Sequence, residues 1–301
     1  MKVGVSFISS NYDLDTTIKM IDESNADYIH VDMMDGIFVE NKNYEVAELK
    51  KMFKKCNKRL DVHMMCCSPN KYVREFAKFG NVEYLTLHYE SHRKPIDVIN
   101  MIRHTNMKVG LAINPETKVS HIIPLLNHVD QVLVMSVHPG KGGQEFMEEV
   151  LYKVETLKDI REQNGYHYII NIDGGINDKT VKAAKNAGVD MVVSGSYVCK
   201  SDNFNERINK LKSWFFFYLY NYDILYIVGD DMKKVFFLLV VLLLPFVVQA
   251  KGECNPNNIQ VQSVVLEEKT NTTLENQEIG LTNNMVNLDL KMHEVGDSVK
   301  Y

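Results

Sequence analysis

Cysteine is scarce in this sequence, and positive charge is not in excess. The 301 residues include five cysteines whose spacing matches neither a disulfide framework nor a metal motif: Cys56, Cys66, Cys67, Cys199 and Cys254. Four of them precede residue 213, so we expect that part of the chain to belong to the cytoplasm, where thiols stay reduced. The net charge of −5 gives no reason to expect nucleic acid as a partner.

Long apolar runs are also lacking, except at residues 235–248. This run is shorter than the roughly 20 residues that a transmembrane helix needs. It follows Met232, Lys233 and Lys234 and ends in a small-residue site at Ala250, so residues 232–250 have the order of a secretory signal peptide. Such a signal normally begins a protein. We therefore expect a gene fusion or gene-call artefact that joins the preceding protein to the start of a secreted protein. The alternative is a membrane anchor, with membrane contact only through 235–250.

The segments on either side of this signal-like segment differ from each other in composition. Residues 214–231 form an aromatic-rich junction, and residues 251–301 are polar and rich in asparagine and glutamate. The polar tail is too short to build a sizeable core alone, and we expect it to be largely unstructured. Residues 1–213 are therefore expected to form the folded, functional domain.

Residues 1–213 alternate short apolar runs with amphipathic segments. The runs predict strands at residues 3–7, 28–34, 60–65, 82–88, 108–113, 131–137, 167–172 and 191–195. The amphipathic segments predict helices near residues 14–24, 45–55, 70–79, 94–105, 118–127, 146–163, 178–187 and 203–212. Eight such units in this length predict an α/β fold, the (β/α)8 TIM barrel, with a doubly wound open sheet as the alternative.

Histidine and aspartate recur at the predicted carboxyl ends of the strands. His30 and Asp32 share one face of the second strand because side chains alternate along a strand. His63 lies in the third strand and Asp173 ends the seventh, and a barrel brings these ends into one ring. Two imidazoles and two carboxylates suit one divalent ion of Zn, Fe, Mn or Co, which would also offset the buried charge. The alternative is that Asp32 and Asp173 cap loops or pair with lysine.

Three glycine-bearing turns follow the last three predicted strands. They are residues 138–144 ("HPGKGGQ"), 173–175 ("DGG") and 194–196 ("SGS"). Glycine lets backbone N–H groups approach a phosphate closely, and barrels commonly bind phosphate in their late strand-to-helix loops. The turns therefore predict a phosphorylated ligand, and Lys141 could add a positive charge.

Eight motifs, in order, resemble the ribulose-phosphate 3-epimerase family over residues 1 to about 212. They are "VSFISSNY", "HVDMMDGIFVEN", "LDVHMM", "LTLHYE", "LAINPET", "VLVMSVHPGKGGQEF", "NIDGGI" and "VSGS". The resemblance implies an isomerase of the pentose phosphate pathway that inverts C3 of D-ribulose 5-phosphate to give D-xylulose 5-phosphate through an enediolate. It also implies a homo-oligomer formed through the barrel.

The resemblance also assigns roles to residues. His30, Asp32, His63 and Asp173 would bind the metal, and Asp32 and Asp173 would be the catalytic acid–base pair. Met34, Met65 and Met135 would cap the planar intermediate with soft, water-excluding sulfur. The residues expected to bind substrate are Ser6, His63, Gly140, Gly142, Gly143, Gly174, Gly175, Gly195 and Ser196.

The sequence departs from the family pattern where the sugar and phosphate would lie. Glu40 replaces a usual proline, Lys141 replaces a usual phenylalanine, and His138 occupies a variable position. A ketohexose 6-phosphate such as D-allulose 6-phosphate is therefore an alternative substrate. A sugar-phosphate-binding protein without catalysis is a second alternative. A barrel decarboxylase or synthase is disfavoured because residues 30–36 and 61–66 lack the Asp-x-Lys-x-x-Asp motif of those enzymes.

Overall fold

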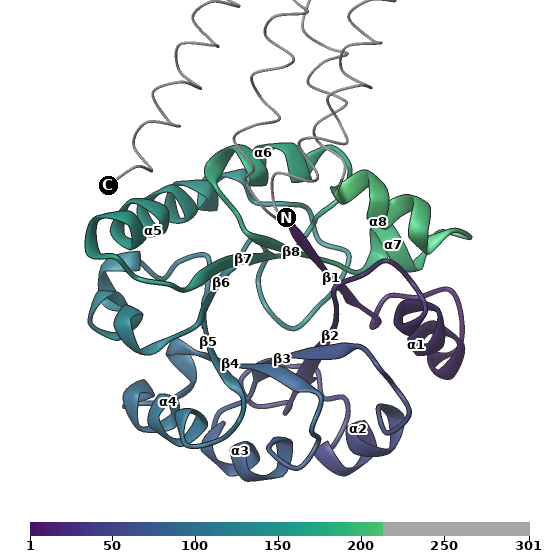
Figure 1. The fold of residues 1–301 in the computed structure, drawn as a ribbon, viewed down its shortest axis with the longest axis horizontal. Coiled ribbons are helices and arrows are strands. Elements are labelled where there is room, and N and C mark those ends of the chain that lie inside the picture. The colour runs from purple at the N-terminus through teal and green to yellow at the C-terminus, as the bar shows by residue number, and fades with distance from the viewer. Residues whose placement is uncertain (213–301) are drawn as a thin grey trace, which may run out of the picture. The chain divides into compact units, whose positions relative to one another are not determined.

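The protein was analysed as a computed structural model, which describes residues 1–212. Eight parallel strands pair in sequence order, and β1 also pairs with β8, so the sheet closes into a barrel (Figure 1). The strands are β1 (Lys2–Ser6), β2 (Tyr28–Met34), β3 (Arg59–Met65), β4 (Val82–His88), β5 (Lys108–Ile113), β6 (Gln131–Met135), β7 (Ile169–Asp173) and β8 (Met191–Ser194). The closed order confirms the predicted TIM barrel and excludes the open sheet.

The α-helices surround the barrel (Figure 1). They are α1 (Leu14–Asp22), α2 (Val46–Met52), α3 (Asn70–Phe76), α4 (Pro95–Arg103), α5 (Leu151–Asn164), α6 (Thr180–Ala187), α7 (Ser196–Cys199) and α8 (Phe204–Lys212). The α-helix expected near residues 118–127 is wrong: two 3₁₀ segments, Val119–His121 and Ile123–His128, replace it. Pro124 explains the difference, because its ring lacks the N–H that a continuous helix would need. The short helix α7 was not predicted.

Some strand ends also differ by one or two residues from the prediction. β6 stops at Met135 instead of residue 137, and β8 stops at Ser194. Directly after β6, the backbone N–H of Ser136 donates to the carbonyl of Asp173 at 2.8 Å, and its hydroxyl lies at hydrogen-bond distance from the carbonyls of Asp173 (2.9 Å) and Gly174 (2.7 Å). This side chain ties the loops after β6 and β7 together at the carboxyl end of the barrel.

The barrel strands separate two buried environments. Their outward faces join the helices in one apolar cluster that includes Val5, Ile29 and Leu85. Inside the barrel, Tyr28 and Tyr84 pack with their ring centroids 5.8 Å apart near the amino ends of the strands. Further along, the interior is polar and buried, and this polar interior leads to the carboxyl ends of the strands, where the candidate site lies.

The described residues contain no helix long and apolar enough to cross a membrane. The predictions for residues 214–231, 232–250 and 251–301 lie outside the residues that the structure describes.

Candidate active site

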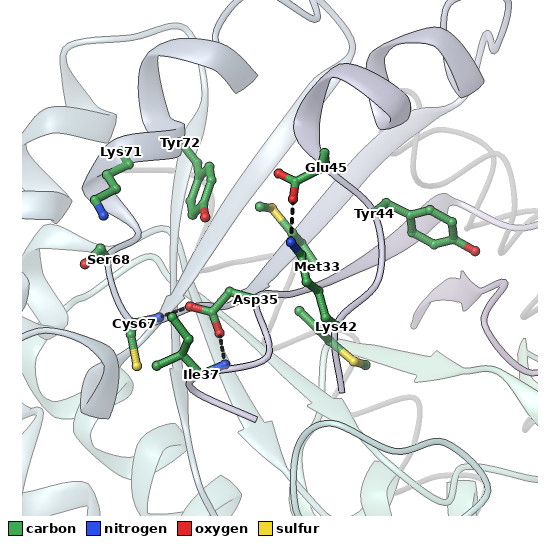
Figure 2. Close-up of a pocket in the computed structure, with 11 residues that line it drawn as sticks. Met33, Asp35, Ile37, Lys42, Tyr44, Glu45, Cys67, Ser68, Lys71 and Tyr72 are labelled. Atoms are coloured by element: carbon green, nitrogen blue, oxygen red, sulfur yellow. Dashed lines mark hydrogen bonds and ion pairs between the residues drawn. The ribbon is translucent and has the colours of Figure 1, made fainter. Parts of the chain in front are cut away.

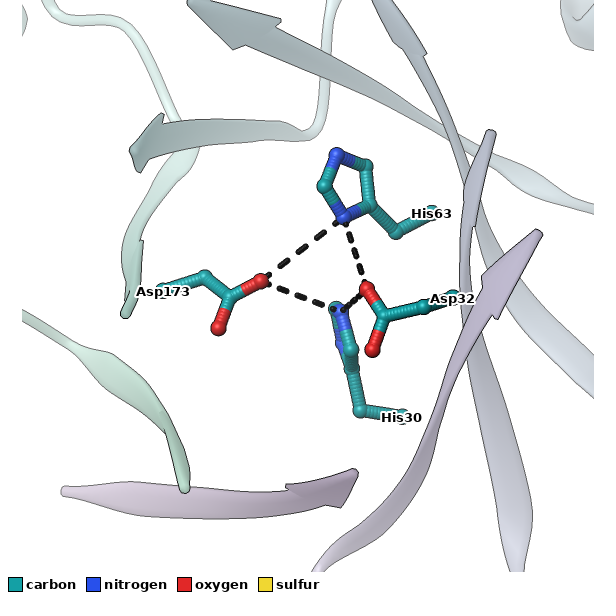
Figure 3. Close-up of side chains that lie close together, drawn as sticks. All are labelled: His30, Asp32, His63 and Asp173. Carbon is teal, nitrogen blue, oxygen red and sulfur yellow. Dashed lines mark hydrogen bonds and ion pairs between the residues drawn. The ribbon is translucent and has the colours of Figure 1, made fainter. Parts of the chain in front are cut away.

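Two histidines and two aspartates meet at the carboxyl end of the barrel (Figure 3). His30 and Asp32 come from β2, His63 from β3 and Asp173 from the tip of β7, and one potential ligand atom of each lies within 4.8 Å of the others. Asp32 Oδ1 lies 3.3 Å from His30 Nε2 and 3.1 Å from His63 Nδ1. Asp173 Oδ2 lies 3.6 and 3.7 Å from the same nitrogens. The sequence prediction that these four side chains converge is confirmed.

A buried hydrogen bond sets the orientation of His30. Its Nδ1 lies 2.8 Å from Asp61 Oδ2, and Gln131 and Asn171 donate side-chain hydrogen bonds to the Asp61 carboxylate at 3.1 and 3.3 Å. The other ring nitrogen, Nε2, therefore points at the two aspartates. It is buried and makes no hydrogen bond within residues 1–212. A buried ring nitrogen that faces two carboxylates and makes no hydrogen bond fits a divalent metal ion.

His63 bridges the cluster to a second buried histidine. Its Nδ1 faces Asp32 and Asp173, while its Nε2 lies 2.7 Å from Nε2 of His88. His88 ends β4, and its Nδ1 lies 3.2 Å from Oε2 of Glu90. Burial lowers the pKa of His88 to about 4, so this imidazole is neutral near pH 7.

The pKa values of His30 and Asp32 in the cluster depend on the charge of their neighbours. Burial works against a charged His30, but the carboxylates of Asp32 and Asp61 outweigh it and hold the pKa of His30 well above its ordinary value. Burial likewise disfavours a charged Asp32, yet His30 and His63 hold its pKa far below its usual range. Asp32 is therefore a carboxylate that requires positive charge beside it. The partners of both aspartates do not support the alternative that they cap loops or pair with lysine.

A cavity of about 70 Å³ lies beside the cluster, and most of the predicted substrate-binding residues line it. His30 and His63 are fully buried beneath it. The cavity is lined by the predicted residues Ser6, Asp32, Met34, Met65, Met135, Gly140, Gly142, Gly143, Asp173, Gly174, Gly175, Gly195 and Ser196. Ser6 donates a 2.7 Å hydrogen bond to Asp32 Oδ2, so its hydroxyl orients one carboxylate. The three glycine turns and the metal-type cluster thus share one cavity.

Comparison with known proteins identifies the family. A sequence model of the ribulose-phosphate 3 epimerase family matches residues 2–199. The chain belongs to the ribulose-phosphate 3-epimerase family. Ribulose-phosphate 3-epimerase of Helicobacter pylori strain J99 is 35% identical over 213 residues, which cover 71% of this chain and 97% of that protein. The enzyme of the same name from Treponema pallidum is 36% identical over 192 residues, covering 64% of this chain and 88% of that protein.

Solved structures support the epimerase-family barrel at the level of the fold alone. KGPDC from Streptococcus mutans superposes with a TM-score of 0.53 at 13% identity, covering 70% of this chain and 95% of that one. The 3-hexulose-6-phosphate synthase from Salmonella typhimurium gives 0.52 at 17% identity, with 70% and 96% covered.

Two loops of the epimerase-family barrel are joined by a hydrogen bond beside the cavity, a contact that was not predicted from the sequence. The loop after β2 carries Asn41, whose side-chain amide donates a 2.8 Å hydrogen bond to the carbonyl of Gly140 in the loop after β6. In the same loop Phe38 packs against His88 with ring centroids 4.8 Å apart. The residues that differ from the family pattern lie near this junction: Lys141 is exposed at the cavity wall, and His138 pairs with Glu116 at 3.3 Å.

A larger pocket of about 240 Å³ lies beside the site, between the loops after β2 and β3 (Figure 2). Lys42 and Glu45 form a 2.9 Å ion pair at its wall. Asp35 accepts a 2.7 Å hydrogen bond from the backbone N–H of Cys67, which joins the two loops. None of the four clustered histidines and aspartates lines this pocket. The larger of the two pockets is therefore not the candidate active site.

Proposed function

We propose that this chain is a metal-dependent ribulose-phosphate 3-epimerase, which interconverts D-ribulose 5-phosphate and D-xylulose 5-phosphate. The observation that carries the proposal is the pair of carboxylates, Asp32 on β2 and Asp173 on β7, which reach one cavity from different sides of the barrel beside two buried histidines. Family membership over nearly the whole length of the Helicobacter pylori relative supports it. The pentose phosphate pathway follows from that reaction.

Epimerisation beside a carbonyl requires a proton to leave C3 on one face and another to arrive on the opposite face. Asp32 and Asp173 are placed for these two transfers, one as base and the other as acid. The C3–H electron pair passes toward the C2 carbonyl oxygen, and reprotonation from the second carboxylate returns it to C3 with inverted configuration. The two aspartates exchange roles in the reverse direction.

Other side chains support these transfers. Ser6 holds one oxygen of Asp32 through its 2.7 Å hydrogen bond, which fixes the plane of the carboxylate. Met34, Met65 and Met135 line the cavity, where their thioethers would exclude water from a planar intermediate. His63 would lie beneath the substrate oxygens, and its Nδ1 faces both carboxylates.

His30, Asp32, His63 and Asp173 would hold the metal, since two imidazole nitrogens and two carboxylate oxygens suit Zn, Fe, Mn or Co. When bound, such an ion would stabilise negative charge that develops on substrate oxygen and would favour the ionised form of the aspartate that acts as base.

The phosphate is proposed to bind at the three glycine turns. At Gly175 the backbone has φ +64°, and an added Cβ would lie 2.6 Å from the backbone nitrogen of Phe146, so only glycine fits the turn. Gly140, Gly142, Gly143, Gly174, Gly195 and Ser196 line the same cavity, and their backbone N–H groups could approach phosphate oxygens.

Substrate choice can be tested directly. The full chain, loaded in turn with each metal, is supplied with D-ribulose 5-phosphate or D-allulose 6-phosphate in separate reactions. The proposal predicts a kcat/KM at least about tenfold higher for the pentose phosphate. The relatives reported above bear the ribulose-phosphate name, which favours this outcome over the ketohexose. A higher kcat/KM for D-allulose 6-phosphate would identify the ketohexose phosphate as the substrate instead. Binding without turnover would favour a sugar-phosphate-binding protein.

We propose that residues 1–213 are the epimerase of the cytoplasm and that 214–301 contribute nothing to turnover. The match over 97% of the Helicobacter pylori protein is made by 213 residues, and the described cysteines Cys56, Cys66, Cys67 and Cys199 are free thiols, which supports both statements. The full chain and a chain ending at residue 213 should have the same kcat. Light scattering of both would test the predicted homo-oligomer.

A further inference from the structure

We propose that Glu90 is a positioning residue of the metal centre: acting through His88, it fixes the tautomer of His63 that leaves Nδ1 free to bind a metal ion. The inference rests on the metal centre proposed above and adds a residue that lies outside it. It is carried by a continuous chain of side-chain contacts that runs from the partly exposed Glu90 through the buried His88 to the buried His63.

The first link is the direction of the bond between the two histidines. An imidazole nitrogen binds a metal only through a lone pair, so His63 Nδ1, which faces Asp32 and Asp173, must carry no proton. In a neutral ring the proton is then on Nε2. The 2.7 Å contact between His63 Nε2 and His88 Nε2 needs one donor and one acceptor. His63 must donate, and His88 must accept.

The second link places the remaining proton of His88. Because Nε2 of His88 is the acceptor, its Nδ1 carries the hydrogen. That nitrogen lies 3.2 Å from Glu90 Oε2, and a carboxylate can only accept. Glu90 thus selects the tautomer of His88 and, through it, the tautomer of His63. Asp61 does the same for His30 in one step, at 2.8 Å from Nδ1.

The third link is the fixed position of Glu90 itself. Its Oε1 accepts hydrogen bonds from the backbone N–H of Asn114, at 3.0 Å, and from the hydroxyl of Thr117. The side chain is 23% exposed, and these bonds leave Oε2 directed at His88. Asp32 favours the other tautomer of His63, because its Oδ1 lies 3.1 Å from His63 Nδ1 and would accept a hydrogen bond from a proton there. When no metal is present, Glu90 counteracts this preference through His88.

This arrangement predicts an unusual effect of an isosteric change. In E90Q the backbone N–H of Asn114 still needs an acceptor, so the amide oxygen stays there and the NH₂ group turns toward His88. The NH₂ group can only donate, so His88 Nδ1 must become the acceptor. The chain then reverses, and the proton of His63 moves to Nδ1, where it competes with the metal.

Metal affinity is the direct readout. Co²⁺ is titrated into the metal-free full chain, and its visible absorption reports binding without any need for turnover. Loss of an outer-shell partner typically costs about 10- to 100-fold in affinity, and we expect E90Q to fall in this range. The control is E83Q: Glu83 belongs to β4, its side chain is 22% exposed, and it accepts hydrogen bonds from Lys108 and Tyr28 at the opposite end of the barrel. E83Q should bind Co²⁺ within about twofold of the wild type.

A double-mutant cycle separates positioning from a structural role. With His88 replaced by alanine, the chain is broken, so adding E90Q should cause no further loss of affinity. If Glu90 merely anchored the loop at Asn114 and Thr117, E90Q would weaken binding equally in both backgrounds, which would overturn the proposal. Near-wild-type Co²⁺ affinity of folded E90Q would also overturn it. Failure of the wild type to bind Co²⁺ would instead refute the metal centre and the inference together.

The tautomers themselves provide a second measurement if E90Q is too unstable for titration. Long-range ¹H–¹⁵N spectra of the Zn²⁺-loaded wild type should show a protonated Nε2 on His63 and a protonated Nδ1 on His88. A spectrum with the proton on Nε2 of His88 would contradict the assigned direction.

Discussion

The side-chain amide of Asn41 donates a 2.8 Å hydrogen bond to the carbonyl oxygen of Gly140, which links the loop after β2 to the loop after β6. Val39 reinforces the link, because an added Cβ on Gly140 would lie 2.7 Å from Val39 Cβ. Gly140 lines the cavity that Asp32 and Asp173 also line, so the link fixes the position of one cavity wall. Two chain segments about a hundred residues apart in the sequence are thus joined beside the cavity.

Replacing Asn41 with alanine removes this link. A hydrogen bond contributes about 1 kcal/mol, so we expect KM to rise roughly fivefold while kcat changes less. N164A is the control, because the Asn164 amide donates to the carbonyl of Ile160 within α5, away from the cavity. Steady-state kinetics of both variants would test the prediction, and an unchanged KM in N41A would show that the loops close without this bond.

Alanine at Gly175 should damage the proposed phosphate turn. Its φ of +64° costs a non-glycine residue roughly 1–2 kcal/mol. The new Cβ would also collide with the backbone of Phe146. G165A separates these effects, since Gly165 has φ +63° but nothing within 4 Å of its added Cβ. Both variants should lose stability in urea, whereas only G175A should show a raised KM. Equal KM values would place the phosphate elsewhere.

The carboxylate of Asp35 should make stability depend on pH. Burial raises its pKa, but hydrogen bonds from the backbone N–H groups of Phe38, Cys67 and Ile37 outweigh burial and hold the pKa below its ordinary value. A depressed folded-state pKa stabilises the fold above the unfolded pKa of about 3.9, and this contribution is lost as the pH falls through the folded value.

Urea unfolding of wild type and D35N from pH 3 to 6 would test this sign. The wild type should be the more stable at pH 6, and the difference should shrink as the pH falls below 4. The control is D159N, which alters an exposed carboxylate on α5. A difference between wild type and D35N that grows toward pH 3 would contradict the prediction.

Metal binding should stabilise the folded chain. An ion at 100 times its Kd adds about 2.7 kcal/mol, which corresponds to roughly 5–10 °C in Tm for a domain of this size. Zn²⁺, Mn²⁺ or Co²⁺ should produce the shift, and H30A should abolish it because His30 Nε2 would no longer face the cluster. Ca²⁺ prefers all-oxygen sites and should have little effect. A Ca²⁺ shift as large as that of Zn²⁺ would argue against a histidine-containing site.

The barrel and its four central residues could be predicted from the sequence because both follow from simple periodicity. Alternation along β2 places His30 and Asp32 on the inner face, and closure of the barrel brings Asp173 to them. The same reasoning located the glycine turns, since strand ends and late loops of a barrel lie at one end.

The surroundings of these four residues could not be predicted, because they depend on side-chain rotamers and loop conformations that sequence periodicity does not encode. Lys153 illustrates the first: it is fully buried on α5, where its Nζ donates to the carbonyls of Asn114 and Pro115 at 2.9 and 2.6 Å. Glu90 illustrates the second, because only the loop at Asn114 directs it toward His88. Both residues look like ordinary surface charges in the sequence.

The central claim, two aspartates that act on opposite faces of one carbon, is tested most directly by solvent deuterium. The metal-loaded full chain and its D32N and D173N variants are incubated in D₂O with either epimer, and proton NMR is recorded after removal of the metal. The wild type should invert C3 and place deuterium there. Each variant should lose inversion at least about 100-fold, and each should retain exchange at C3 of a different epimer, because one carboxylate remains to remove its proton. Inversion without deuterium, or inversion at the wild-type rate in either variant, would contradict the account.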